Sequence, residues 1–327
     1  MATPNTSRTL FSPLRITGSI LMAVTIGSVG QAQSSGYGVD EDSDDFYKIS
    51  EPNSTWSIDL GVTAFGEGNL NKNGEDLSLS RTRLSFNYAW PSTKNSKYSI
   101  RIMEEDSNYD FDGVQPLGLI TPFRSVKQTT FSTSFTKWDK DGSWILNTAL
   151  SSGRESGVSV SQGIYAELVT GKLWKWNDNV KVGIGLYAYT QLENDATFLP
   201  FPIFEWQIAD DLKFGFIESS HPGFGLKYNW TDSVDLYVIG SQDVRQYRLL
   251  DRTEVSGNTS AAVDDAISLR AGFVYGDDTF KAELFGGLTR RELTVESSGT
   301  THSLGAGEGD DVVDPAASIG ASLSWRL

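Results

Sequence analysis

The chain ends in the stretch PAASIGASLSWRL, residues 315–327, and this stretch decides the fold. Its residues Ile319, Leu323, Trp325 and Leu327 alternate with small or polar residues, so an extended strand would carry them on one face. The other face would carry Ser, Gly and Arg side chains. Such a strand could form the edge of a soluble sheet or close a membrane barrel. The rest of the sequence distinguishes these two possibilities.

The N-terminal segment, residues 1–32, has the organisation of a secretory signal peptide. Arg8 and Arg15 precede the apolar run ITGSILMAVTIGSVG, residues 16–30, and a small-residue cleavage pattern ends at Ala32. We therefore expect export, with cleavage after Ala32. An uncleaved anchor helix is disfavoured, because the apolar run is short and is interrupted by Gly, Ser and Thr.

Composition excludes several classes of function. The chain has no Cys, which rules out disulfides, thiolate metal sites and a lipid-modified N-terminal Cys. Without Arg8 and Arg15 the 27 basic residues fall to 25 against 42 acidic ones, so the exported chain carries a net charge near −17. Nucleic-acid binding needs a basic footprint and is not expected. No Gly-rich nucleotide motif opens a helix, and we expect no cofactor.

Beyond the signal peptide the sequence acquires a period of two. Residues 33–54 form a polar, acidic leader, and from Thr55 onward apolar residues alternate with polar ones. No run of about 18 apolar residues follows Ala32, so a membrane could be crossed only by strands closed into a barrel. We expect about fourteen strands, with twelve as the alternative, at 55–65, 77–90, 97–106, 125–138, 143–152, 163–176, 180–192, 197–208, 212–217, 223–230, 234–248, 265–275, 279–294 and 316–327.

Charged residues fall out of phase with the apolar ones along these strands. In a transmembrane barrel the apolar face meets lipid and the polar face lines the lumen, and a basic residue on the lipid side costs roughly 2–4 kcal/mol at mid-depth. Rows of opposite charge in the lumen could orient permeating solutes or form salt bridges that fill a closed core. The residues expected to face the lumen are Asp59, Arg81, Arg83, Arg101, Lys181, Glu205, Lys227, Asp235, Asp243, Arg270, Lys281 and Glu283.

The connections and the Trp residues predict how the barrel is oriented. Tight turns such as DKDG and TDS interleave with long segments such as LLDRTEVSGNTSAAVDD, a pattern typical of short periplasmic turns and long extracellular loops. Seven of the nine Trp residues lie close to a short turn, and Trp56 and Trp325 begin and end the barrel. Trp prefers the membrane interface, so we expect all nine at the periplasmic one. The chain is predicted to be all-β, with an antiparallel transmembrane β-barrel over residues 55–327.

The closing strand SIGASLSWRL resembles the C-terminal strand of bacterial outer-membrane proteins, which alternates apolar residues and ends on one. That family usually ends in Phe, whereas this chain ends in Leu327. The stretches LPFPIFEWQIADDLKFGF, residues 199–216, and VIGSQDVRQYRLLD, residues 238–251, also look like a family of uncharacterised outer-membrane barrels. The resemblance implies the outer membrane of a Gram-negative bacterium, contact with lipid and lipopolysaccharide, and assembly by the barrel-assembly machinery through the C-terminal strand.

Few residues suggest chemistry. The two His residues, His221 beside Ser219 and Ser220 and His302 beside Ser303, are interpreted as polar loop residues. A catalytic triad would need a third group that orients the base, and neighbours in a loop rarely meet that geometry.

Two further motifs have plain interpretations. The acidic run DEDSDD, residues 40–45, has the spacing of an EF-hand calcium loop, but Asp45 stands where that loop needs Gly, so a solvated leader is favoured. Arg245 and Arg248 lie at the base of a predicted loop. We expect them to be surface arginines, with lipopolysaccharide phosphate as the alternative ligand.

The sequence favours a monomeric outer-membrane barrel that acts as a passive channel for small solutes. Two alternatives remain open. One is a sealed structural barrel that binds lipopolysaccharide or a partner, and the other is a lipid-modifying enzyme that uses His221 or His302.

Overall fold

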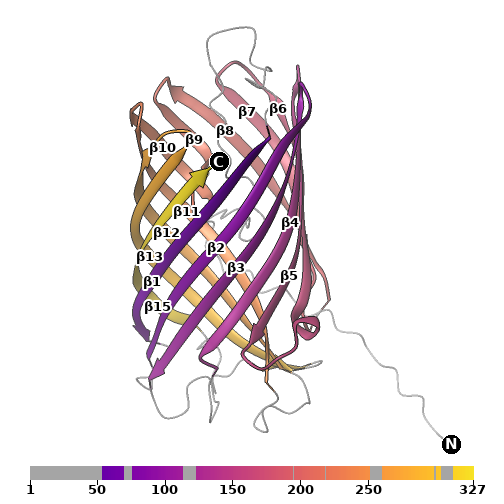
Figure 1. The fold of residues 1–327 in the computed structure, drawn as a ribbon, viewed down its shortest axis with the longest axis vertical. Helices are drawn as coiled ribbons and strands as arrows, with labels where there is room; N and C mark the ends of the chain where they lie inside the picture. Colours follow the sequence, from indigo (N-terminus) through magenta and orange to yellow (C-terminus); the bar gives the residue numbers. More distant parts are fainter. Residues whose placement is uncertain are drawn as a thin grey trace, which may run out of the picture.

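The alternating strands form a barrel because each strand of the wall pairs with a neighbour on both sides. The computed structural model describes residues 54–69, 76–112, 123–193, 195–217, 219–250, 260–297, 300–302 and 312–327. They form a closed antiparallel barrel, in which the last strand pairs with the first and completes the circle (Figure 1). Among these residues no helix is long and apolar enough to cross a bilayer.

Within the described residues fourteen strands build the wall. They are β1 (Thr55–Asn69), β2 (Asp76–Thr93), β3 (Ser96–Asp112), β4 (Ser125–Asp139), β5 (Gly142–Glu155), β6 (Ile164–Lys175), β7 (Val180–Tyr189), β8 (Thr197–Ala209), β9 (Leu212–Ile217), β10 (Gly223–Thr231), β11 (Val234–Leu249), β12 (Ser260–Gly276), β13 (Phe280–Ser297) and β15 (Val312–Arg326). A three-residue strand, β14 (Thr300–His302), pairs with the end of β13, and a 3-10 helix, η3 (Val160–Gly163), precedes β6. The predicted all-β barrel of fourteen strands is confirmed, and the alternative of twelve is wrong.

The two ends of the barrel differ as the sequence predicts. Connections of two to four residues lie at one end, which we call the short-turn end, and the longer connections lie at the other, the long-loop end. All nine Trp residues lie within three residues of a strand end at the short-turn end. There the rings of Trp56 and Tyr88 stack at 4.3 Å, and those of Tyr88 and Trp90 at 5.3 Å. The aromatic residues therefore form a belt around the short-turn end.

The polarity of the two strand faces reverses toward the long-loop end. In the middle of β3 the apolar Ile102 is exposed and Arg101 is buried, as a membrane strand requires. Further along β3, Tyr109 and Phe111 are buried whereas Asp110 is exposed. Apolar residues inside and polar residues outside are the arrangement of a barrel surrounded by water. The strands thus extend beyond their membrane-type segments.

A hydrophobic core fills this extension, and we call it the apolar cap. Phe123 and Val126, for example, are completely buried. The expected polar lumen therefore does not reach the long-loop end, and the predicted strand 97–106 ends six residues early because the apolar residues change face. The members of the cap are Phe65, Leu77, Leu79, Tyr109, Phe111, Phe123, Val126, Tyr247, Leu249, Ala262, Leu293, Val295 and Val313.

Side chains can fill the long-loop half because it is narrower than the short-turn half. The strands β6 to β10 have only 6 to 13 residues, whereas the other nine have 14 to 18. Beyond the ends of those short strands, β5 and β11 meet side by side in parallel, with Arg154 opposite Arg248. Fourteen strands therefore enclose the short-turn half and nine enclose the long-loop half, and the interior of a barrel shrinks with strand number.

Gly153 makes the contact between β5 and β11 possible. A Cβ atom at Gly153 would lie 1.8 Å from the carbonyl oxygen of Gln246, and one at Gly163 would lie 2.1 Å from the carbonyl oxygen of Gly153. Three backbone segments thus meet where only glycine fits.

The connection after β7 stabilises the contact between β5 and β11 through hydrogen bonds and an ion pair to β11. The side chain of Gln246 accepts a hydrogen bond from the backbone nitrogen of Leu192 at 2.9 Å and donates one to the carbonyl oxygen of Thr190 at 3.1 Å. Arg248 forms an ion pair with Glu193 and donates from Nε to the carbonyl oxygen of Gln162 at 3.1 Å.

We predict that Gly153→Ala separates β5 from β11 and lowers stability by about 1–3 kcal/mol, the usual cost of overpacking. The measurement is urea unfolding in detergent micelles, together with the temperature at which the folded band shifts on an SDS gel. Gly286→Ala is the matched control, because a Cβ atom there would meet only the carbonyl oxygen of Ser318 at 3.7 Å. Equal stability of the two variants would contradict the assignment.

Candidate functional site: the charged lumen

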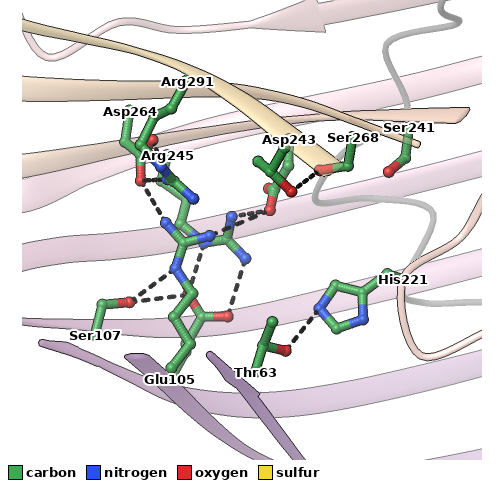
Figure 2. A network of polar contacts seen from close by, with 12 residues as sticks. Thr63, Glu105, Ser107, His221, Ser241, Asp243, Arg245, Asp264, Ser268 and Arg291 are labelled. Atoms are coloured by element: carbon green, nitrogen blue, oxygen red, sulfur yellow. Dashed lines mark hydrogen bonds and ion pairs between the residues drawn. The ribbon is translucent and has the colours of Figure 1, made fainter. Parts of the chain in front are cut away.

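Charged side chains from opposite walls meet in the lumen (Figure 2). They lie next to the apolar cap, because Arg81 and Asp264 both hydrogen-bond to Tyr109. Three are arginines and three are carboxylates, so their formal charges balance, and none is more than 9% exposed. We call them the ion-pair layer. Its members are Arg81 of β2, Glu105 of β3, Asp243 and Arg245 of β11, Asp264 of β12 and Arg291 of β13.

Arg245 connects β11 with β3 across the lumen. Its Nε donates to Oε1 of Glu105 at 2.6 Å and its Nη2 donates to Oε2 of the same carboxylate at 3.0 Å. This two-bond geometry is the strongest arrangement available to an arginine and a carboxylate. Arg245 also forms an ion pair with Asp243 on its own strand.

Asp264 is the acceptor at the other side of the layer. It is completely buried and accepts hydrogen bonds from Arg81, Arg291 and the hydroxyl of Tyr109. Arg81 also donates from Nε to the hydroxyl of Ser107 at 3.2 Å. Every charge in the layer thus has a partner of opposite sign within the layer.

A polar cavity of about 170 Å³ lies on the short-turn side of the ion-pair layer. Neutral side chains such as Tyr237 and Ser322 form part of its lining. Seven of the residues predicted to face the lumen supply its charges, so four basic groups face three acidic ones. They are Asp59, Arg83, Arg101, Lys227, Asp235, Lys281 and Glu283.

The two buried carboxylates of the cavity take hydrogen bonds mainly from neutral groups. Asp59 accepts from Asn87 at 2.6 Å, from Ser85 at 3.0 Å and from Ser324 at 2.5 Å. Glu283 accepts from the hydroxyls of Tyr237 and Ser322 and from a backbone nitrogen. The nearest ion pair of Asp59 is to Arg101, with 3.9 Å between Oδ2 and Nη2.

The connection between β9 and β10 folds into the lumen and borders this cavity. Ser219 and Ser220 line the cavity, and the backbone nitrogen of Ser220 donates to Oε2 of Glu283 at 2.9 Å. His221 points across the lumen toward Thr63 of β1, with 3.5 Å between Nε2 and Oγ1 (Figure 2). The predicted polar loop residue His221 is thus a lumen residue.

The histidines were also candidates for catalysis. Ser220 and His221 do approach each other, with 3.0 Å between Oγ and Nδ1. The second ring nitrogen of His221 faces the hydroxyl of Thr63 and not a carboxylate, so the described contacts lack the acid that orients the base of a triad. His302 lies in β14, where its backbone pairs with Val295.

The remaining predicted lumen residues lie outside the lining of this cavity. Arg81 and Asp243 belong to the ion-pair layer, and Arg270 donates to the hydroxyls of Ser241 and Ser268. At the short-turn mouth, Glu205 lies between two lysines: its Oε2 is 3.6 Å from Nζ of Lys181 and 3.7 Å from Nζ of Lys213.

Sequence reasoning missed four of the six members of the ion-pair layer: Glu105, Arg245, Asp264 and Arg291. Glu105 lies just inside the predicted strand 97–106, and Asp264 lies one residue before the predicted strand 265–275. Arg245 was expected at the surface, and this interpretation is wrong, because Arg245 is 3% exposed and bound to two carboxylates. Arg291 is in phase with the inward-facing Glu283 of its strand, and Glu105 is in phase with Arg101 of its own. This alternation is the signal that could have identified both residues.

Other predictions fall on residues that the structure does not describe. The signal peptide of residues 1–32 lies outside the described residues. So does almost all of the leader of residues 33–54, including its calcium-like run.

Comparisons with known proteins return only structural likeness. No family model and no curated protein matches the chain. Solved structures of bacterial outer-membrane barrels are similar in fold. An outer-membrane channel from Pseudomonas putida F1 has a TM-score of 0.47 and 6% identity, over 86% of this chain and 98% of that one. The P. putida toluene transporter TodX has a TM-score of 0.40 and 9% identity, over 92% and 98% of the two chains, and the NanC porin has a TM-score of 0.34 and 8% identity, over 82% and 100%. At these values the likeness concerns the barrel architecture alone.

We predict that Arg81→Gln lowers the free energy of unfolding by about 3–5 kcal/mol, because it leaves three buried carboxylates facing two arginines and removes one of the two ion pairs of Asp264. Arg83→Gln, two residues along the same strand face, should change it far less, since Arg83 has no ion pair among the described residues. Urea unfolding followed by Trp fluorescence measures both. A loss for Arg83→Gln as large as that for Arg81→Gln would contradict this description of the lumen.

Proposed function

We propose that this protein is a passive outer-membrane channel for small solutes. The polar cavity in the fourteen-stranded half carries the proposal, because a merely structural barrel has no need of a charged chamber at its wide end. Solutes enter the chamber from the short-turn mouth. Its four basic and three acidic groups favour polar molecules over apolar ones.

The narrow half acts as the barrier of the channel. The ion-pair layer and the apolar cap occupy the nine-stranded ring, so a solute passes only when these side chains part. Tyr247 lies at the boundary of the two, since it belongs to the cap and follows Arg245 by two residues on the inward face of β11. Conductance is therefore limited at the narrow half.

The outer surface supports a membrane setting for the same proposal. Ile319 and Leu323 of the closing strand are 68% and 47% exposed, and Trp325 beside them is 59% exposed. A band of apolar side chains ending in an aromatic belt matches the hydrocarbon core and one interface of a bilayer. The chain works there as a monomer, exported by its signal peptide, assembled through β15 and surrounded by lipid and lipopolysaccharide. It has no enzymatic role in this proposal.

Planar-bilayer recording of the refolded protein tests the channel. We expect discrete conductance steps, and larger steps for Tyr247→Ala, because this completely buried ring blocks the narrow half. Leu150→Ala is the control, since Leu150 is 51% exposed on the outer face and should leave the steps unchanged. If correctly folded wild type and Tyr247→Ala are both silent, the protein is not a channel.

The filled narrow half favours a second candidate, a sealed structural barrel that interacts through its loops. This candidate predicts silence in the bilayer together with binding to lipopolysaccharide vesicles. Conductance steps from folded protein would exclude it.

Replacing His221 with Ala should leave lipid turnover by outer-membrane vesicles unchanged, because no carboxylate of the described residues contacts the imidazole. Loss of a turnover that the wild type possesses would instead identify an enzyme.

A further inference from the structure

We infer that the lumen cavity contains a binding site for one oxyanion, the carboxylate or phosphate group of a small solute, formed by Arg83 of β2 and Arg101 of β3. The inference rests on the proposed channel function in one respect, because it names the class of solute that the channel would favour. The binding site itself follows from the side chains that line the cavity.

Arg83 is a buried cation without a partner. It is 6% exposed and lines the cavity, yet its Nε and Nη1 have no hydrogen-bond partner. No carboxylate of the described residues forms an ion pair with it. Arg81, two residues earlier on the same face, has the carboxylate of Asp264 and is less than 10% exposed as well. Burial alone therefore does not explain why Arg83 has no carboxylate partner among the described residues.

Arg101 adds a second cation with unused capacity. It is 5% exposed, and its Nη2 donates to Ser85 at 2.8 Å, but its Nε has no partner. Asp59 is 3.9 Å away, beyond hydrogen-bond distance, and its oxygens already accept from three neutral side chains. Asp59 is thus held mainly by neutral groups, and Glu105, which lies opposite Arg83 in the register of β2 and β3, is bound by Arg245.

The wall leaves room for the guanidinium group of Arg83. A Cβ atom at Gly61 of β1 would lie 3.5 Å from Nη2 of Arg83, an ordinary van der Waals distance, so the guanidinium group lies against this strand without crowding. A guanidinium group stays charged in proteins and presents a planar fork that matches an oxyanion. An anion in the cavity would supply the hydrogen-bond acceptor that Nε and Nη1 of Arg83 lack.

The rest of the cavity fits a small anionic solute. Lys281 lies nearer the short-turn mouth, and Lys227 is 2.9 Å from Asp235, so the lining of the cavity carries one more basic group than acidic ones. A positively lined cleft raises the local concentration of anions. The volume of about 170 Å³ accommodates a compact group and not a long chain.

Thermal unfolding with added anions tests the site without requiring conductance. Trp fluorescence melts of the refolded full chain in detergent would be recorded with sodium acetate, sodium phosphate and, as the reference for screening, sodium chloride at equal ionic strength. Acetamide is the uncharged analogue of acetate. We expect saturable stabilisation by acetate or phosphate beyond that by chloride, and none by acetamide. Stabilisation by acetate alone would identify carboxylates as the solutes that the site binds. Stabilisation by phosphate alone would identify phosphorylated solutes. The absence of both overturns the inference.

Variants separate the site from general charge effects. Arg83→Gln should weaken anion binding by about tenfold or more, because it removes the hydrogen bonds of a charged group. Arg83→Lys should fall between Arg83→Gln and the wild type, since it keeps the charge and loses the fork. Lys181→Gln removes one charge at the mouth, outside the cavity lining, and should bind like the wild type. Anion binding by Arg83→Gln equal to the wild type would overturn the inference, and the gel shift on heating verifies that each variant is folded.

Bilayer recording distinguishes failure of the site from failure of the channel. In a conducting barrel, Arg83→Gln should shift the reversal potential in a salt gradient toward cations. A silent bilayer with anion binding that depends on Arg83 would reject the channel and keep the site. Conductance without anion-specific stabilisation would keep the channel and reject the site.

Discussion

The contact between β5 and β11 determines how the rest of the barrel is built. Buried backbone groups need hydrogen-bond partners, so the longer strands on either side of the five short ones must pair with each other beyond the ends of those short strands. Gly153 lets β5 approach β11 closely enough for the nine longer strands to close on themselves. One chain thereby forms a wide fourteen-stranded half and a narrow nine-stranded half.

This difference in width separates two kinds of interior. In the narrow half, side chains from opposite walls reach each other, and the apolar cap and the ion-pair layer fill the ring. In the wide half they do not reach, and a cavity remains between the same rows of charges. Arg81 and Arg83 illustrate the consequence: two residues apart on one face, the first is neutralised by the opposite wall and the second is not.

The charges of the lumen are therefore distributed by level and not by strand. Three arginines and three carboxylates cancel in the ion-pair layer, whereas four basic groups face three carboxylates in the cavity. The acidic net charge of the chain, −15 overall, thus lies elsewhere than in this chamber. A passive channel of this form would screen solutes in its chamber and limit their passage at the narrow half.

The sequence by itself indicated the barrel, about fourteen strands, the two unequal ends and an inward-facing row of charges that includes Asp59 and Arg83. These follow from local alternation, because a strand exposes one face to lipid and the period of two is visible along the chain. Only the tertiary structure decided that Arg245 meets Glu105, that Asp264 lies inside, and that Arg83 lacks a partner. Those facts depend on how far apart the walls stand at each level. That distance is set by the closure of β5 on β11, residues 94 positions apart at their point of contact, and no local pattern records it.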